Sequence, residues 1–282
     1  MRGRTAAGAA LLAVTAVGCG GGGGGAPLVL EGTPPAAPYS GPLHVSTRGA
    51  DDGSTRSRRL ASGAAGRALE CDGRIFEGGG PDGWARSDGG ATPEDGLRLY
   101  FDMFQPQQPG DGYRVERAEA DRVLYSFDVG GRTKVAVVVA KDQPGRPGWG
   151  PETHASCDPA ELPARYAVAE GWQVWTDAHG RRVPVGRLSS SAGPEHCGWQ
   201  SARFLDLGGR TYVRDPDGVL DRAGLLTAPY RDHVPMPAGA RDTGYHYRGL
   251  RLWLTGDRNT AYVRTGGTVE AWPQAKRDAG CE

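Results

Sequence analysis

The chain has 282 residues, with 33 Lys and Arg against 33 Asp and Glu, and it contains 46 glycines and 21 prolines. The length is sufficient for about two ordinary domains. The balanced charge argues against a nucleic-acid-binding protein, because proteins that hold phosphate backbones carry a basic excess or a basic face. The glycine and proline content, with an apolar fraction of 38%, argues against an all-helical protein.

The N-terminus predicts export. A short basic segment is followed by an apolar stretch, residues 6–17, which is too short to span a bilayer because a spanning helix needs about 20 residues. The stretch ends in small residues before Cys19 and resembles a bacterial lipobox, with Ala16 where Leu, Val or Ile is usual. We expect residues 1–19 to be a lipoprotein signal sequence, with lipid on Cys19 anchoring the chain to the outer face of the cell membrane. An ordinary cleaved signal peptide is the alternative.

The segment after the signal is poor in large apolar residues. Residues 20–68 consist mainly of Gly, Pro, Ala, Ser and Arg. Such a composition buries too little surface to offset the entropy of ordering the chain. We therefore expect a flexible tether that holds the folded part away from the membrane, with an edge strand at residues 42–46 as the alternative for part of it.

The first long regular element is predicted to begin at Thr92. Thr92 suits an N-cap, Pro93 suits the first helical position, and apolar residues recur with helical spacing over residues 97–104. Farther along, two apolar runs are joined by the glycines at 130–131, which is a two-residue hairpin signal. Residues 69–164 are therefore predicted to form a helix packed on an antiparallel meander.

The second half predicts shorter strands. They are expected at residues 172–176 and 183–188, and again between residues 250 and 272. Residues 197–207 fit one face of a helix, but together with the two glycines that follow they also fit a β-hairpin, and we favour the helix. Residues 165–282 are thus predicted to form a second module.

The cysteine spacing predicts two disulfides. If Cys19 carries lipid, four cysteines remain in a chain that meets an oxidising compartment. Cys71 and Cys157 are 86 residues apart, and Cys197 and Cys281 are 84 residues apart, so one bridge within each half is favoured. A reactive or metal-binding Cys197 is the alternative. Because ligands at recurring short spacing are missing from the sequence, we expect no metal and no cofactor.

An internal repeat supports this division. In each half a Gly-Tyr pair, at residues 112–113 and 244–245, is followed by strands, a tryptophan and a cysteine in the same order. The sequence therefore predicts an α+β fold of two tandem modules, each an antiparallel meander with about one packed helix and one intramodule disulfide.

Several short runs carry a resemblance. They are residues 148–150, 157–159, 193–201, 212–220, 242–245 and 269–273. These runs resemble a group of exported actinobacterial lipoproteins and secreted proteins to which no activity is assigned. The resemblance covers roughly residues 70–282 and implies compartment and architecture, while function stays open.

Catalytic motifs are missing from the sequence. We find no nucleophile elbow, phosphate-binding glycine loop, dinucleotide fingerprint or zinc-binding helix motif. The serines at 189–191 form a catalytic triad only if the fold brings them to His196 and Asp215. A zinc site from His196, His233 and His246, or a calcium site at Asp215, would lack part of its usual pattern. A non-catalytic role is favoured, and an enzymatic one stays open.

The seven tryptophans are the best indication of binding. Indole combines a large apolar face with one hydrogen-bond donor, which suits interfaces and stacking on sugar rings. Trp84 and Trp199 stand beside glycines and are the ligand-binding candidates. Two hypotheses follow. The first is a non-catalytic, membrane-tethered lipoprotein that binds an envelope protein or glycan, and the second is a hydrolase acting on cell-envelope material.

Overall fold

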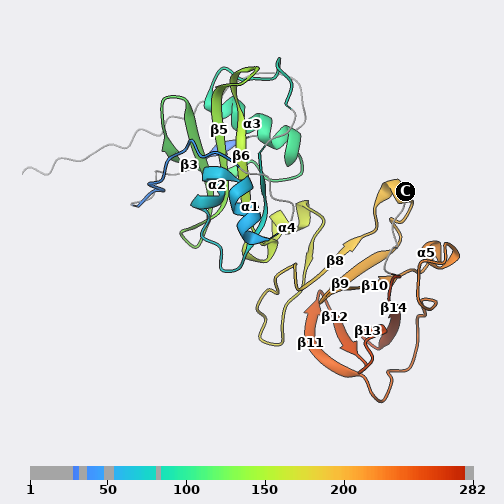
Figure 1. Ribbon diagram of the computed structural model, residues 1–282. Helices are drawn as coiled ribbons and strands as arrows, with labels where there is room; N and C mark the ends of the chain where they lie inside the picture. Colours follow the sequence, from blue (N-terminus) through green and yellow to red (C-terminus); the bar gives the residue numbers. More distant parts are fainter. Residues whose placement is uncertain (1–27, 32–36, 48–53, 81–83, 277–282) are drawn as a thin grey trace, which may run out of the picture.

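The computed structural model describes residues 28–31, 37–47, 54–80 and 84–276. Within them it contains three sheets, which are mostly antiparallel, and few helices (Figure 1). This confirms the expectation of a protein that combines helices with mostly antiparallel sheets. We call residues 28–172 the N-terminal region and residues 173–276 the C-terminal region.

The N-terminal region is built on one six-stranded sheet with the order β1-β3-β4-β5-β6-β2. Its strands are β1 (Val29–Leu30), β2 (Ile75–Gly79), β3 (Asp111–Ala118), β4 (Arg122–Val129), β5 (Arg132–Gln143) and β6 (Arg146–Cys157). Only β1 pairs in parallel, with β3. The predicted hairpin at Gly130 and Gly131 is confirmed, and both glycines have positive φ, as a tight hairpin turn requires.

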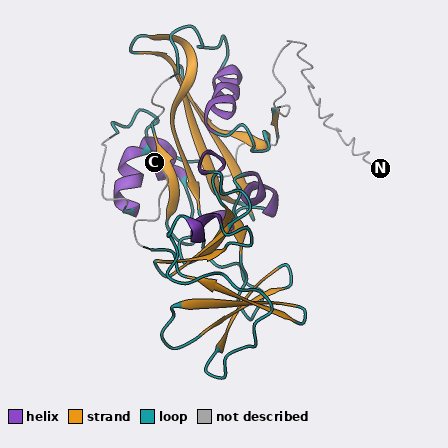
Figure 2. Cartoon of the chain, turned by 90° about the vertical axis from the view of Figure 1, so that its right-hand side faces the viewer, coloured by secondary structure: helices purple, strands orange, loops and turns teal. Residues whose placement is uncertain are grey.

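Helices cover both faces of this sheet (Figure 2). α3 (Pro93–Phe104) packs on one face, against Val135 and Val137 of β5, and α2 (Gly63–Ala68) packs on the other, against Ala136 and Val138. Because its alternate residues fill two separate cores, β5 is a continuous apolar run instead of an alternating one.

The predicted start of α3 is confirmed. Thr92 accepts a hydrogen bond from the Asp95 amide at 3.2 Å, and the Asp95 carboxylate accepts one from the Thr92 amide at 3.0 Å. This capping box, with Pro93 as the first helical residue, satisfies amides that would otherwise be unpaired at the helix N-terminus.

The segment before Cys71 differs from the expected tether. Residues 54–68 form α1 (Thr55–Ala61), which contacts β2, and α2, whose Ala64 and Ala65 are fully buried. Leu43 is also buried, although residues 42–46 form no strand. The composition of this segment favoured a tether because small residues bury little area each. The same small residues, however, let a helix pack closely on the sheet. Residues 20–27, 32–36 and 48–53 lie outside the described residues.

The C-terminal region consists of two four-stranded sheets. One has the order β10-β9-β8-β7 and the other β11-β12-β13-β14. The first contains β7 (Gln173–Val174), β8 (Leu188–Ala192), β9 (Arg203–Leu207) and β10 (Arg210–Arg214), and the second contains β11 (Arg241–Tyr247), β12 (Leu250–Leu254), β13 (Thr260–Thr265) and β14 (Thr268–Pro273).

These two sheets join at both edges. Thr176, which follows β7, exchanges two backbone hydrogen bonds of 2.9 Å with His246 of β11. At the other edge the Ala275 amide donates to the Thr211 carbonyl at 2.8 Å, beside a bridge between Tyr212 and Gln274. The inner faces therefore enclose one core, which contains Trp175, Leu188, Leu205, Tyr212, Leu252 and Trp272.

One expectation for a helix needs correction. Residues 203–214 form the β9–β10 hairpin rather than a helix, because Gly208 and Gly209 take the positive φ values of its turn. Between residues 69 and 164 the long helix is α3, and α4 (Ala164–Ala169) and the short α5 (Val219–Arg222) follow it in the described residues. The additional helices α1 and α2 lie in the segment that was expected to be a tether.

One predicted disulfide is present. Cys71 and Cys157 are bonded, with Cα atoms 5.3 Å apart, and the bond ties the segment after α2 to the end of β6. Such bonds persist in oxidising compartments, so the disulfide indicates an extracytoplasmic setting. Within the described ranges, no helix has the length and apolar character needed to cross a membrane.

Candidate functional site

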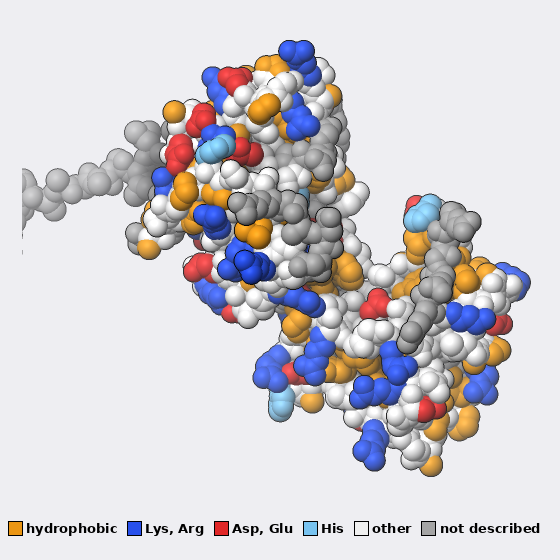
Figure 3. Space-filling model, viewed as in Figure 1, with side chains coloured by type: hydrophobic (Ala, Val, Ile, Leu, Met, Phe, Trp, Pro, Cys, Tyr) orange, Lys and Arg blue, Asp and Glu red, His pale blue; other side chains and the backbone are white. Residues whose placement is uncertain are grey.

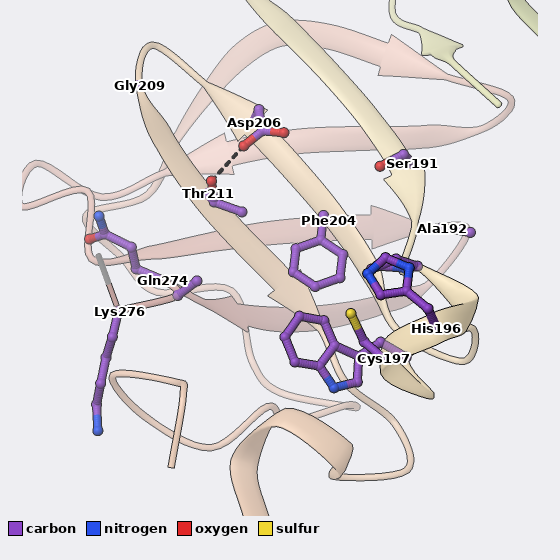
Figure 4. Close-up of a pocket in the computed structure, with 13 residues that line it drawn as sticks. Ser191, Ala192, His196, Cys197, Phe204, Asp206, Gly209, Thr211, Gln274 and Lys276 are labelled. Carbon is purple, nitrogen blue, oxygen red and sulfur yellow. Dashed lines mark hydrogen bonds between the residues drawn. The ribbon is translucent and has the colours of Figure 1, made fainter. Parts of the chain in front are cut away.

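A groove of about 540 Å³ lies on the outer face of β8–β10 (Figure 4). Its lining consists of Ser191, Ala192, Pro194, His196, Cys197, Trp199, Phe204, Asp206, Gly209, Thr211, Gln274, Ala275 and Lys276. The groove therefore draws on two hairpin strands, the loop before them and the segment after β14. Of the two tryptophan candidates, only Trp199 belongs to it.

An aromatic wall forms one side of the groove. The rings of Trp199 and Phe204 stack with centroids 5.9 Å apart and planes 28° apart. A short turn fixes the indole, because the Trp199 amide donates to the Pro194 carbonyl at 3.2 Å and Gly198 takes a positive φ. Gly193 leaves room for it, since a Cβ there would lie 2.2 Å from the Trp199 carbonyl oxygen. The indole is 9% exposed and packs in a small core with Val213 and Leu220, so the half-buried Phe204 is the more exposed ring of this wall.

Polar groups form the rest of the rim. Thr211 of β10 donates a hydrogen bond of 2.5 Å to the carboxylate of Asp206, its directly opposite partner on β9. Figure 4 shows Phe204 between this pair and His196. Gln274 accepts a hydrogen bond of 3.1 Å from Arg210. A groove with a flat aromatic wall and several hydroxyl, amide and carboxylate groups suits a polar ligand with one apolar face.

Trp84 does not belong to a binding surface. It is 2% exposed. A Cβ on Gly150 would lie 2.5 Å from its ring, so the neighbouring glycines make room for the indole inside the N-terminal region. The Arg146 guanidinium lies 5.5 Å from the ring centroid. Its burial argues against the predicted ligand-binding role.

The candidate triad is not assembled. The buried Asp215 carboxylate accepts hydrogen bonds from the amides of residues 219–221 and so caps α5. Ser190 accepts from the indole of Trp175 and donates to Gln173. Of the three serines, only Ser191 reaches the groove with His196, and no hydrogen bond joins these two within the described part of the chain. The cap also accounts for the Asp-Pro-Asp-Gly sequence without calcium.

The histidines and cysteines form no metal site in the described residues. There, the one group of three or more potential ligands close together is Cys71, Cys157 and Glu161, and its two cysteines are bonded to each other. Cys197 is also disulfide-bonded, so it offers no thiolate. Its predicted partner Cys281 and the predicted lipid site Cys19 lie outside the described residues.

A pair of carboxyl groups lies elsewhere, in the N-terminal region. Burial raises the pKa of Glu77 on β2, and burial together with the nearby Glu77 charge raises the pKa of Glu170 after α4. Gln105 donates to Glu77 at 3.4 Å, and Gln108 is the amide partner of Glu170. Two such coupled groups are a common feature of acid–base sites.

The same carboxyl pair lies near Tyr100, because the charges of Glu77 and Glu170 add to burial in raising the pKa of its hydroxyl. His154 contacts Tyr100 and Phe104, and burial lowers the pKa of His154 to about 4. The two glutamates are 93 positions apart in the sequence, without a shared motif, so sequence reasoning had no signal with which to pair them.

Comparison of the chain with models of protein families, with curated proteins and with solved structures finds no match. The functional reading therefore rests on the geometry of the chain itself.

Proposed function

We propose that this chain is an extracytoplasmic lipoprotein that binds a cell-envelope glycan in the groove beside Trp199. The observation that carries the proposal is the fixed Trp199–Phe204 pair, with the half-buried Phe204 ring on the same strand face as the polar Asp206–Thr211 pair. Sugar rings have one apolar face and a rim of hydroxyls, so stacking and hydrogen bonding are available in the same groove.

The mechanism we propose is presentation. Lipid on Cys19 fixes the chain at the outer face of the membrane, and the glycine-rich residues after it supply reach. Residues 69–164 and 165–282 act as two tandem modules, with a second disulfide between Cys197 and Cys281. That bond would hold the turn before Trp199, because Cys197 is the last residue of that turn and also lines the groove.

Retention on purified cell wall tests this proposal. Asp206→Ala and Thr211→Val remove polar groups of the groove without touching a core, and we expect each to weaken retention at least about threefold, as loss of one hydrogen bond does. Asp232→Ala, at an exposed position outside the groove, is the matched control. Unchanged retention in both groove variants would overturn the glycan proposal.

The anchor requires its own test. Cys19→Ala should release the chain from the membrane fraction into the soluble extracytoplasmic fraction, whereas the groove variants should stay with the membrane. Recovery of the Cys19→Ala chain in the membrane fraction would contradict lipid anchoring.

A hydrolase acting on envelope material is the second candidate, and the Glu77–Glu170 pair is the observation that favours it. Glycoside hydrolysis uses two carboxyl groups, one of which needs a raised pKa to act as the general acid, and either glutamate could take that role. The test is release of soluble fragments from purified cell wall. Loss of release in both Glu77→Gln and Glu170→Gln would support the enzyme, and no release by the unmodified chain would exclude it.

A further inference from the structure

A row of basic side chains crosses the second sheet of the C-terminal region. His246 of β11 is directly opposite Arg251 of β12, and Arg251 is directly opposite Arg264 of β13. The neighbouring residues Leu252 and Val263 are buried in the core between the sheets. Because side chains alternate along a strand, the two arginines project from the outer face, and both are exposed.

The pairing of Arg251 with Arg264 is unfavourable by itself. Side chains directly opposite on adjacent strands are close enough to interact, and like charges there destabilise the sheet. Within the described part of the chain neither arginine takes part in an ion pair, and the contact found for Arg264 is a hydrogen bond of 3.0 Å to the Gly266 carbonyl. The charge of this pair is therefore not compensated by those residues.

The two arginines flank a hollow of about 370 Å³. Its lining consists of Gly249, Arg251, Arg264 and Gly266. The glycines sit in the hairpin turns before β12 and before β14, with φ values of 85° and 57°. A Cβ at either glycine would meet nothing within 4 Å, so the turns leave the hollow open where they border it.

The region around the hollow carries more basic than acidic residues. One carboxylate, that of Asp242, lines the adjoining hollow, which shares Arg251, and it accepts a hydrogen bond of 2.8 Å from the Gly244 amide. Residues 173–282 carry 15 Lys and Arg against 12 Asp and Glu, whereas residues 20–172 carry 16 against 21. Basic side chains (blue) outnumber acidic ones (red) on the visible face of the C-terminal region in Figure 3. The overall neutrality of the chain conceals this difference.

We propose that the hollow between Arg251 and Arg264 binds a phosphate group of an anionic ligand. A guanidinium presents its donors in a planar fork that matches phosphate oxygens, and Arg251 lines the same hollow as Arg264, whose terminal Nη groups remain beyond its Nε bond to Gly266. A phosphate would also neutralise the repulsion between the two arginines. This site is on β12 and β13, apart from the groove on β8–β10, and it does not depend on the ligand of that groove.

The first experiment is a titration of the full chain with glycerol 3-phosphate at constant ionic strength, monitored by the arginine Nε–H signals in NMR spectra. We expect Arg251→Gln and Arg264→Gln each to weaken binding at least tenfold, and the control Arg241→Gln, an exposed arginine at the start of β11, to leave it within twofold. Circular dichroism checks that each variant is folded.

Arg251→Lys separates a phosphate site from general attraction to charge. It keeps the positive charge and removes the fork, so binding should fall toward that of Arg251→Gln. The proposal is overturned if Arg251→Lys binds as tightly as the unmodified chain. It is equally overturned if chloride displaces glycerol 3-phosphate at equal concentration.

A second arm identifies the source of the phosphate. Cys19→Ala removes the proposed lipid, and cosedimentation of this chain with phosphatidylglycerol vesicles is compared with phosphatidylcholine vesicles. Arginine-dependent cosedimentation with the anionic vesicles assigns the site to lipid headgroups, and arginine-dependent binding of glycerol 3-phosphate alone assigns it to soluble or polymeric phosphates. Failure of both probes overturns the proposal without affecting the glycan groove.

Discussion

The two regions of this chain bury their sheets in different ways. The N-terminal region covers both faces of one sheet with helices, so β5 is buried along residues 133–140. The C-terminal region folds two sheets against each other around the core of their inner faces, and a second, smaller core that includes Val213 of β10 and Leu220 of α5 lies on the outer side of the first sheet. The Trp199 groove lies beside this smaller core, and the arginine hollow lies on the outer face of the second sheet. The region with fewer helices therefore leaves more sheet surface for binding.

Removal of the Cys71–Cys157 bond should have the largest effect. The bond closes a loop of 86 residues within the N-terminal region. In the chain-entropy model, loss of such a bond costs about 4 kcal/mol. Cys71→Ser with Cys157→Ser should shift the urea unfolding of that region, followed by its own NMR amide signals, and leave the transition of the amide signals of the C-terminal region in place. A common shift of both transitions would contradict separate stability of the regions.

Overpacking beneath α2 should have a smaller effect. Ala65 is fully buried against the sheet, so Ala65→Leu should destabilise the chain by about 1–3 kcal/mol in urea unfolding. Arg67→Ala, at an exposed position of the same helix, should stay within about 0.5 kcal/mol. Equal stability of Ala65→Leu and the unmodified chain would restore the tether interpretation of this segment.

The carboxyl pair should give the N-terminal region a distinctive pH dependence. Because the pKa values of Glu77 and Glu170 are raised in the folded state, their contribution is fully present below the unfolded values and is lost as pH rises through the folded ones. Glu77→Gln should therefore gain stability relative to the unmodified chain as pH rises above about 4.3, the ordinary pKa of glutamate. Unfolding free energies measured from pH 4 to 7 check the sign.

His154 contributes with the opposite sign in an overlapping pH window. Its folded pKa is lowered to about 4, so its contribution is present above the ordinary histidine value and is lost as pH falls toward about 4. The comparison of His154→Gln with Glu77→Gln separates the two. If the two variants show the same slope with pH, one of the assignments is wrong.

Relief of the arginine pair should have the smallest effect. Arg251→Thr removes the like charge opposite Arg264, and we expect the C-terminal region to gain about 0.2–1 kcal/mol in urea unfolding. Such a gain would indicate that the pair is retained for binding at some cost to stability. A loss of stability would show instead that Arg251 has a structural partner.

Local patterns in the sequence predicted what depends on neighbouring residues. The N-cap at Thr92, the hairpin at Gly130 and the Cys71–Cys157 bond follow from side-chain chemistry, turn geometry and cysteine spacing, and the structure confirms all three. Tertiary structure decided the rest. Whether a small-residue helix packs, as α2 does, depends on a sheet that is distant in the sequence.

The same limit applies to the candidate sites. Trp84 and Trp199 both stand beside glycines in the sequence, yet Trp84 is enclosed by the distant Gly150, whereas the turn at Gly198 places Trp199 at the edge of a groove. The pairing of Arg251 with Arg264 depends on strand register, and the meeting of Glu77 with Glu170 depends on how β2 and α4 pack. Sequence thus determined the capped helix, the hairpin and one disulfide, while contacts between distant segments decided which side chains face a ligand.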